Sequence, residues 1–196
     1  MIAIVDYKAG NIRSVENALG RLGAEYVLSA DPEIIRRADH LILPGVGESS
    51  SAMESLNATG LVPVIKSLTQ PVLGICIGLQ LMCSFSEEGD TECLGIFSPS
   101  VRRFPDVPGV KIPHTGWDTI TDLGGPLFRN IPEGSFVYYV HSFCPDVEAG
   151  QTAAVTEYSG VRFSAALQKD NFFGTQFHPE KSGPTGAEIL RNFIEL

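Results

Sequence analysis

Short apolar runs alternate with segments of helical periodicity through the first half of the chain. The apolar runs are strand candidates and lie at residues 2–6, 26–29, 40–43 and 72–75. Such alternation is typical of β-α-β units, which place their strands in a parallel sheet and their helices on its faces. We therefore expect an α/β protein with a flavodoxin-like, open and mostly parallel sheet that has helices on both faces.

The segments between these runs carry start and stop signals of helices. Asn11 can cap a helix whose apolar residues recur at helical spacing, and Gly23 supplies its C-terminal stop. Pro32 opens a second, shorter helix. Residues 48–66 are predicted to be helical with a break near Gly60 and Pro63.

Strand-forming residues dominate from Leu94 onward, where Pro and Gly turns separate the segments. The predicted strands are residues 97–104, 111–121, 135–143, 153–156, 161–168 and 172–177. An amphipathic helix follows at residues 186–196. Because no linker is long enough to divide the chain, we expect one domain over residues 1–196, whose C-terminal half is a strand-rich antiparallel extension.

The charge balance and the cysteines restrict the setting in which the chain works. With 14 Lys and Arg against 23 Asp and Glu, the formal net charge is −9, which disfavours nucleic acid or an anionic membrane surface as a partner. Four cysteines without a C-x-x-C pair favour a reducing compartment, and the first residues lack the pattern of a signal peptide. The uncharged stretch at residues 67–86 has too many Pro, Gly and Gln interruptions for a membrane helix. We expect a cytoplasmic protein.

The run Gly74-Ile75-Cys76-Ile77-Gly78 follows a predicted strand and precedes a helical segment. It has the form of a nucleophile elbow with cysteine in place of serine. A sharp strand-to-helix turn exposes the nucleophile above the sheet, and the flanking glycines let the neighbouring backbone pass without a Cβ clash. A small buried thiol in a glycine-rich turn is the alternative reading.

The run His178-Pro179-Glu180 directly follows the predicted strand 172–177. Pro179 favours an extended backbone at His178, and residues two apart on an extended chain point to the same side. A cysteine nucleophile needs a base to move its proton, and that base needs a carboxylate to orient it. Cys76, His178 and Glu180 are therefore the candidate catalytic triad.

The run Pro44-Gly45-Val46-Gly47 lies at the carboxyl end of the predicted strand 40–43. Ligands of open α/β sheets bind beyond the carboxyl ends of the strands, where Cys76 is also expected. Backbone N–H groups of Val46, Gly47 and Ile77 are candidates for an oxyanion hole. A simple Pro-Gly turn is the alternative for this run.

Taken together, these motifs resemble the class I, triad-type glutamine amidotransferases, whose glutaminase domain carries a G-x-C-x-G-x-Q elbow and a C-terminal H-P-E. Residues 74–80 read G-I-C-I-G-L-Q. Within that family, the chain is most similar to the glutaminase subunits of imidazole glycerol phosphate synthase. The similarity is carried by residues 6–11, 44–47, 113–118, 139–143 and 176–182.

The resemblance implies hydrolysis of L-glutamine to glutamate through a glutamyl thioester. It further implies a heterodimer, in which the ammonia passes through a channel to a (β/α)8-barrel cyclase subunit for histidine biosynthesis. By motif matching, the resemblance assigns substrate binding to Gly47, Gln80, Glu88, Ser142 and Phe143. It assigns the partner interface to Asn11, Trp117, Tyr138 and Lys181.

The residues themselves leave two of these assignments open. A carboxylate at Glu88 suits the α-ammonium of glutamine, with a solvent-exposed acid as the alternative. A core position is the alternative for Trp117, since tryptophan is highly buried on average.

Neither a cofactor nor a metal ion is expected. The four histidines lack the spacing of metal ligands, and no cysteine-rich cluster indicates zinc. The chain also lacks the G-x-G-x-x-G and G-x-x-x-x-G-K-[ST] phosphate loops, so a phosphorylated acceptor is expected to bind on another subunit.

Three residues depart from the family pattern, and two other functions compete with it. Lys8 stands where a small residue is common, Asp118 replaces an Asn, and Phe143 replaces a frequent Tyr. The first alternative is the glutaminase of anthranilate or pyridoxal phosphate synthesis, which shares the triad but not the P-H-x-G-W run. The second is a flavodoxin-like redox sensor or chaperone with an oxidisable elbow cysteine, which has no need of His178 and Glu180 together.

Overall fold

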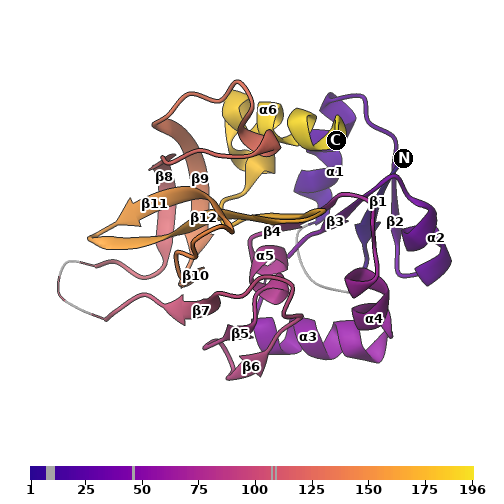
Figure 1. Cartoon of the computed structure of the whole chain (residues 1–196), viewed down its shortest axis with the longest axis horizontal. Helices are drawn as coiled ribbons and strands as arrows, with labels where there is room; N and C mark the ends of the chain where they lie inside the picture. The colour runs from indigo at the N-terminus through magenta and orange to yellow at the C-terminus, as the bar shows by residue number, and fades with distance from the viewer. Residues whose placement is uncertain (8–11, 46, 107, 109) are drawn as a thin grey trace.

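A seven-stranded sheet runs through the computed structural model, which describes residues 1–7, 12–45, 47–106, 108 and 110–196 (Figure 1). In order across the sheet, its strands are β11 (Thr152–Tyr158), β12 (Val161–Lys169), β13 (Phe172–Thr175), β4 (Val72–Ile75), β3 (His40–Leu43), β1 (Ile2–Val5) and β2 (Tyr26–Ser29). Neighbouring strands are parallel from β2 to β13, and β12 is antiparallel to both of its neighbours. This mostly parallel sheet confirms the expected fold class.

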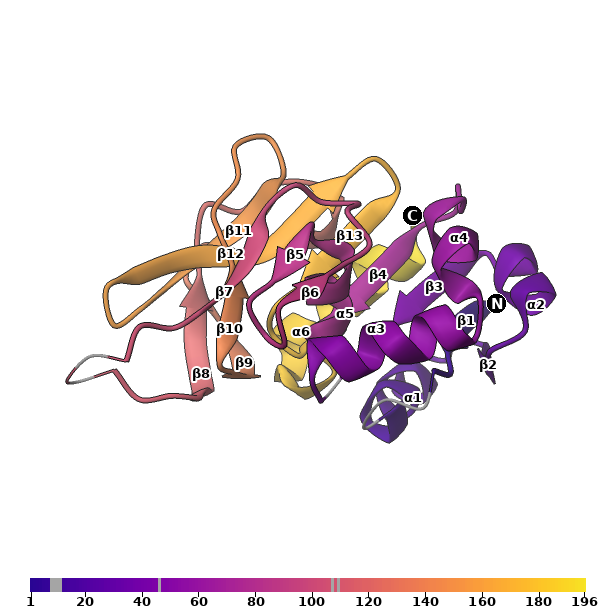
Figure 2. The same cartoon turned by 90° about the horizontal axis from the view of Figure 1, so that it is seen from below.

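Helices cover both faces of the sheet. On one face lie α1 (Ile12–Arg21) and α6 (Gly183–Ile194), and on the other lie α3 (Ser49–Ala58), α4 (Leu61–Lys66) and α5 (Ile77–Met82) (Figures 1 and 2). The short helix α2 (Pro32–Arg37) begins at Pro32 as predicted, and the Asp31 carboxylate accepts a hydrogen bond from the Glu33 N–H at 2.8 Å. The break near Gly60 separates α3 from α4 as expected. Pro63 does not break the helix as predicted, because it lies in the first turn of α4, where proline is tolerated. The predicted cap Asn11 lies outside the described residues.

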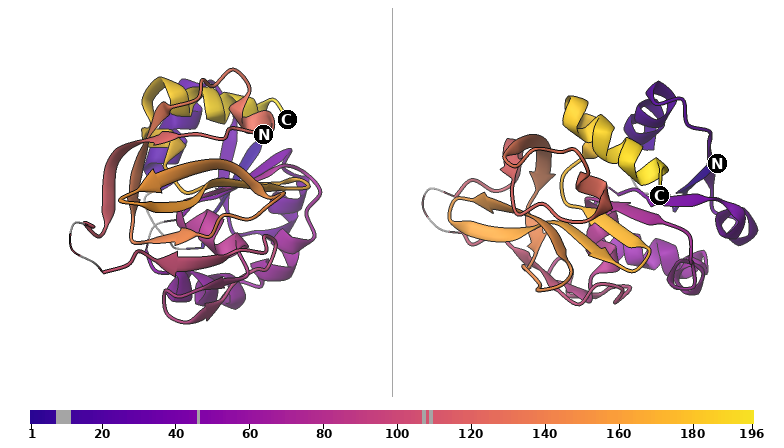
Figure 3. Two further views of the ribbon diagram at one scale, coloured as in Figure 1. Left: turned by 60° about the vertical axis from the view of Figure 1, so that its left-hand side comes forward. Right: turned by 45° about the horizontal axis from the view of Figure 1, so that its top comes forward.

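Strands between residues 85 and 145 form two smaller sheets (Figure 3). One has the order β10 (Phe143–Pro145), β7 (Ser100–Arg103), β5 (Phe85–Ser86) and β6 (Thr91–Glu92), and the other pairs β8 (His114–Ile120) with β9 (Ser135–His141). The single strand predicted at residues 135–143 is therefore two strands. The chain leaves the β8–β9 pair at Ser142, and the next residue, Phe143, pairs with Arg103 of β7.

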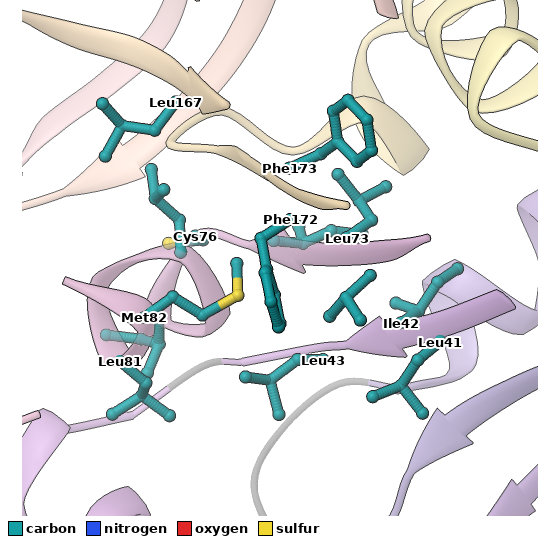
Figure 4. Close-up of a cluster of buried hydrophobic side chains, with 14 of the residues drawn as sticks. Leu41, Ile42, Leu43, Leu73, Cys76, Leu81, Met82, Leu167, Phe172 and Phe173 are labelled. Carbon is teal, nitrogen blue, oxygen red and sulfur yellow. The ribbon is translucent and has the colours of Figure 1, made fainter. Parts of the chain in front are cut away.

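The middle of the central sheet is apolar on both faces. All four residues of β1, of β4 and of β13 are buried, as expected for parallel strands that have helices on both sides. In the close-up of this core, Leu43, Met82 and Phe172 surround β4, and Cys76 lies at the margin of the same cluster (Figure 4). The candidate nucleophile is therefore attached directly to the buried core of the sheet.

Helix α5 packs directly on the backbone of β3 and β4. A Cβ added to Gly78 would lie 1.9 Å from the Leu43 carbonyl oxygen, and one added to Gly74 would lie 2.7 Å from the Gly78 carbonyl oxygen. Glycine is therefore required at both positions, because no side chain fits between the helix and the sheet. This close contact fixes where α5 begins.

Replacement of Gly78 by alanine tests this packing. The new Cβ would clash with a carbonyl group of β3, a strand held on both sides by β1 and β4. We expect Gly78→Ala to lower the free energy of unfolding by about 3 kcal/mol, measured by urea denaturation. Gly20→Ala in α1 is the matched control, because nothing lies within 4 Å of its added Cβ. Alanine there is expected to stabilise the helix by up to about 1 kcal/mol, and equal effects of the two changes would contradict the packing described.

Candidate active site

Cys76 occupies the turn between β4 and α5 with a φ of 53° and a ψ of −106°. A residue with a side chain is disfavoured there by roughly 1–3 kcal/mol, so the turn persists only because its surroundings fix it. The Cys76 N–H donates to the Thr175 carbonyl at 2.7 Å, and the Cys76 carbonyl accepts from the Gln80 N–H at 3.1 Å. The backbone therefore has the sharp strand-to-helix turn of a nucleophile elbow at the carboxyl end of β4.

His178 and Glu180 lie side by side just beyond β13. The His178 Nδ1 atom is 2.8 Å from Glu180 Oε1, and both side chains are almost fully buried. The His178 N–H donates to the Tyr138 carbonyl at 2.9 Å, which fixes the backbone that carries the ring. The Nε2 atom is buried without a hydrogen-bond partner in the described part of the chain, so it is free to exchange a proton with Cys76 or a substrate.

The surroundings of His178 set its protonation state. Burial alone lowers the pKa of this imidazole, but the adjacent Cys76 sulfur and the Glu180 carboxylate outweigh that effect and raise the pKa to about 9. A histidine with this pKa carries its second proton at neutral pH. A histidine in this state is able to act as an acid toward a leaving group.

A cavity of about 400 Å³ opens in front of Cys76 and His178. Its lining comes from six segments of the chain: Gly47, Cys76, Ile77, Gln80, Glu88, Pro113, Val140, His141, Ser142, Phe143 and His178. All five residues predicted to bind substrate are among them, and so are Gly47 and Ile77 of the predicted oxyanion hole. Val46 lies outside the described residues.

Three lining residues were not predicted from the sequence. Pro113, Val140 and His141 belong to the motif runs 113–118 and 139–143, but no role was assigned to them. Burial, with His114 and His178 nearby, lowers the pKa of His141 to about 3, although the Phe143 carbonyl opposes this shift. His141 is therefore neutral and acts in the site only through hydrogen bonds.

Glu88 lines the cavity and contacts Ser49, the first residue of α3. Its Oε2 atom accepts hydrogen bonds from the Ser49 N–H at 2.8 Å and the Ser49 hydroxyl at 2.9 Å. Ser86 supports the pair, because its hydroxyl accepts from the Glu88 N–H at 3.2 Å. One carboxylate oxygen is thus held by the protein at a helix N-terminus, which favours a negative charge, and the side chain lines the cavity.

The outer face of the β8–β9 pair is apolar. Trp117 is 55% exposed and Phe136 is 59% exposed, so the core alternative for Trp117 is wrong. The Trp117 ring meets the Tyr138 ring edge to face with 5.8 Å between centroids. Val140 extends this surface to the cavity. Sequence reasoning missed Phe136 and Val140, although they alternate along β9 with the buried Val137 and Tyr139 and so point to the same side as Tyr138.

Lys181, the fourth predicted interface residue, ends the 3-10 turn η2 (Pro179–Lys181). It is half-buried and lines a second hollow of about 490 Å³ between α1 and α6. In the described part of the chain, no three His, Cys, Asp or Glu side chains gather as metal ligands do. None of the described helices combines the length and apolarity needed to cross a membrane.

Comparisons with known proteins agree with this geometry. A family model described as glutamine amidotransferase class-I matches residues 3–196. The imidazole glycerol phosphate synthase subunit HisH of Bacteroides thetaiotaomicron is 56% identical over 196 residues, which cover 100% of this chain and 99% of that protein. The subunit HisH of Yersinia pseudotuberculosis is 46% identical, with 100% of this chain and 99% of that protein covered.

Solved structures agree on the fold. A putative GMP synthase protein from Thermoplasma acidophilum superposes with a TM-score of 0.76 at 21% identity, over 99% of this chain and 92% of that one. At this identity the structural similarity supports the fold alone, whereas the family model and the full-length similarity to HisH support membership of a family. The chain belongs to the class I glutamine amidotransferases, in the family of the HisH subunits of imidazole glycerol phosphate synthase.

Proposed function

We propose that the chain, as one domain, hydrolyses L-glutamine to glutamate and ammonia and supplies the ammonia to a cyclase subunit for imidazole glycerol phosphate synthesis in histidine biosynthesis. The observation that carries this proposal is a strained Cys76 beside a buried His178–Glu180 pair at one cavity. A redox or chaperone cysteine has no need of that pair. Full-length relatives named HisH favour this synthase over the anthranilate and pyridoxal phosphate systems.

The first half of the reaction forms the acyl enzyme. The Cys76 thiolate attacks the side-chain amide carbon of glutamine, so that a carbon–sulfur bond forms and the amide oxygen becomes an oxyanion. Backbone N–H groups of Ile77 and Gly47, with Val46, stabilise that charge. When the intermediate collapses, the carbon–nitrogen bond breaks and His178 gives its proton to the leaving nitrogen, which departs as ammonia.

The second half of the reaction releases glutamate. His178, now neutral, takes a proton from a water molecule as that water attacks the thioester carbon. The carbon–sulfur bond then breaks, which restores the Cys76 thiolate and the protonated His178. Throughout both halves Glu180 accepts the Nδ1–H of His178 and keeps Nε2 directed at the reacting atoms.

Glu88 and Gln80 are suited to hold the substrate. Because Ser49 fixes one oxygen of Glu88, the carboxylate presents a preformed anion to the α-ammonium of glutamine. The Gln80 Oε1 atom is buried without a partner in the described residues and accepts from a substrate N–H. Ser142 and Phe143 complete the walls of the cavity.

The apolar outer face of β8 and β9 suits a partner subunit. Trp117, Tyr138 and Phe136 form a continuous apolar patch, and Val140 belongs both to this patch and to the cavity. The cavity beside Cys76 therefore shares the residue Val140 with this patch, which suits the passage of ammonia toward a partner bound there. We propose that a (β/α)8-barrel cyclase docks there in a heterodimer, with Lys181 at the margin and a channel for the ammonia, in the cytoplasm. Asn11, outside the described residues, stays a predicted interface residue.

Removal of the nucleophile tests the division of labour between the two subunits. In the complex with the cyclase, we expect Cys76→Ala to lower glutamine-dependent synthesis by about 10⁴-fold or more, because no thioester forms. Synthesis from added ammonium salt should remain, since the cyclase takes up ammonia directly. Cys93→Ala is the control and should retain both activities. Loss of the ammonia-dependent reaction in an intact Cys76→Ala complex would contradict the proposal.

The alkaline limb of the pH profile tests the role of Glu180. Glutaminase activity requires protonated His178, so kcat/KM is expected to fall as the pH rises above about 9. Glu180→Gln removes the negative charge that helps to raise this pKa, so the fall should begin roughly one pH unit lower. Glu157→Gln, on the exposed part of β11, is the control and should not change the pH at which kcat/KM falls. An unchanged limb in Glu180→Gln would show that the carboxylate does not control His178.

A further inference from the structure

Gln176 is a fully buried polar residue between β13 and His178 that has no role in the mechanism described above. Its N–H donates to the Ala165 carbonyl of β12 at 2.8 Å, which fixes its backbone. Its side-chain Nε2 atom lies 3.7 Å from Cys76 Sγ, within the range of an N–H···S hydrogen bond. The amide thus contacts the reacting atom itself.

The neighbouring hydrogen bonds determine which end of the Gln176 amide faces the sulfur. Gln80 Nε2 lies 2.9 Å from the Phe143 carbonyl oxygen, which only accepts, so the Gln80 nitrogen is correctly assigned to that position. The same nitrogen lies 3.0 Å from the Gln176 side chain, which must therefore present its oxygen to Gln80. The NH2 group of Gln176 is left to face Cys76.

Two histidines hold this network from the other side. The Phe143 carbonyl also accepts from His141 Nδ1 at 2.8 Å, so the neutral His141 presents its Nε2 lone pair to His114 Nδ1 at 3.0 Å. The His114 ring stacks on Tyr158 with 3.9 Å between centroids. Each side chain in this series, from His114 through His141 and Gln80 to Gln176, is therefore held by a hydrogen-bond partner. The side-chain N–H of Gln176 is thus held in place toward the sulfur.

We propose that Gln176 is a further catalytic residue, whose side-chain N–H stabilises the Cys76 thiolate as a second partner beside His178. A neutral donor lowers the energy of the anion in a buried site and adds no charge that would compete with His178 for Glu180. In the thioester the sulfur carries no negative charge, so the N–H···S bond weakens. It strengthens again as the thiolate is expelled, which favours release of glutamate. This inference rests on the proposed role of Cys76 as nucleophile.

Few other groups near the sulfur compete with this donor. The Val140 carbonyl lies 4.0 Å from Sγ and accepts only from the protonated thiol, so it does not stabilise the anion. Burial and the Cys76 charge raise the pKa of Tyr7, which stays neutral and donates to the Pro44 carbonyl instead. Glu180 faces His178 and Glu88 faces Ser49. Gln176 and His178 are therefore the groups to which we assign stabilisation of the thiolate.

The test is the pH dependence of Cys76 alkylation by iodoacetamide in the complex with the cyclase, resolved by peptide mass spectrometry. Only the thiolate reacts, so the rate follows the thiolate fraction. We expect Gln176→Met to move the half-maximal rate about one pH unit higher, because the thiolate loses one of its two partners. Gln70→Met is the matched control, because its amide donates to the Ile35 carbonyl far from the site, and it should not move the profile.

A second variant, Gln176→Asn, serves if Gln176→Met does not fold. Gln176→Asn keeps the amide but withdraws it from the sulfur by one methylene, and it should shift the profile in the same direction. A folded Gln176 variant with the wild-type profile would overturn the inference, even if its glutaminase rate fell, because a purely structural role lowers activity without moving the profile. The measurement needs no turnover. A wild-type complex that does not hydrolyse glutamine would instead contradict the proposed function.

Discussion

Cys76 holds a backbone φ of 53°, and the packing around it keeps this unfavourable turn closed. A Cβ on Gly78 would lie 1.9 Å from the Leu43 carbonyl oxygen, and one on Gly45 would lie 2.8 Å from the Gly78 backbone nitrogen. The helix that follows Cys76 is therefore seated directly on β3 and on the loop after it. Because those contacts are backbone contacts in the sheet core, the position of the sulfur is set by the fold and varies little with surface changes.

His178 reaches Cys76 from a second direction, and the β8–β9 pair holds it there. The Tyr138 carbonyl takes the His178 N–H at 2.9 Å, and the Ser182 hydroxyl accepts from the Tyr138 N–H at 2.9 Å while it donates to the His178 carbonyl at 2.6 Å. Tyr138 also packs against the exposed Trp117. A protein docked on Trp117 would thus be separated from His178 by one residue, Tyr138.

Local sequence signals predicted the parallel strands and the turn at Cys76 well, because both depend on nearest neighbours in the chain. The bounds predicted for β2, β3 and β4 are those observed. The division of residues 135–143 at Ser142 escaped prediction, since it depends on which distant strand accepts Phe143. Gln176 escaped for the same reason: its partners lie about 100 residues away, and its sequence position beside His178 indicates only a strand end.

The other three cysteines are poorly suited to act as the nucleophile. Burial raises the pKa of the Cys83 thiol, raises that of Cys93 to about 11 and raises that of Cys144 to about 12, so these thiols stay protonated at neutral pH. The most direct measurement treats the complex with an electrophilic glutamine analogue and locates the adduct by peptide mass spectrometry. The predicted result is a single adduct on Cys76 that excess L-glutamine prevents. An adduct on another cysteine, or one that glutamine does not prevent, would contradict the assignment of Cys76 as the nucleophile.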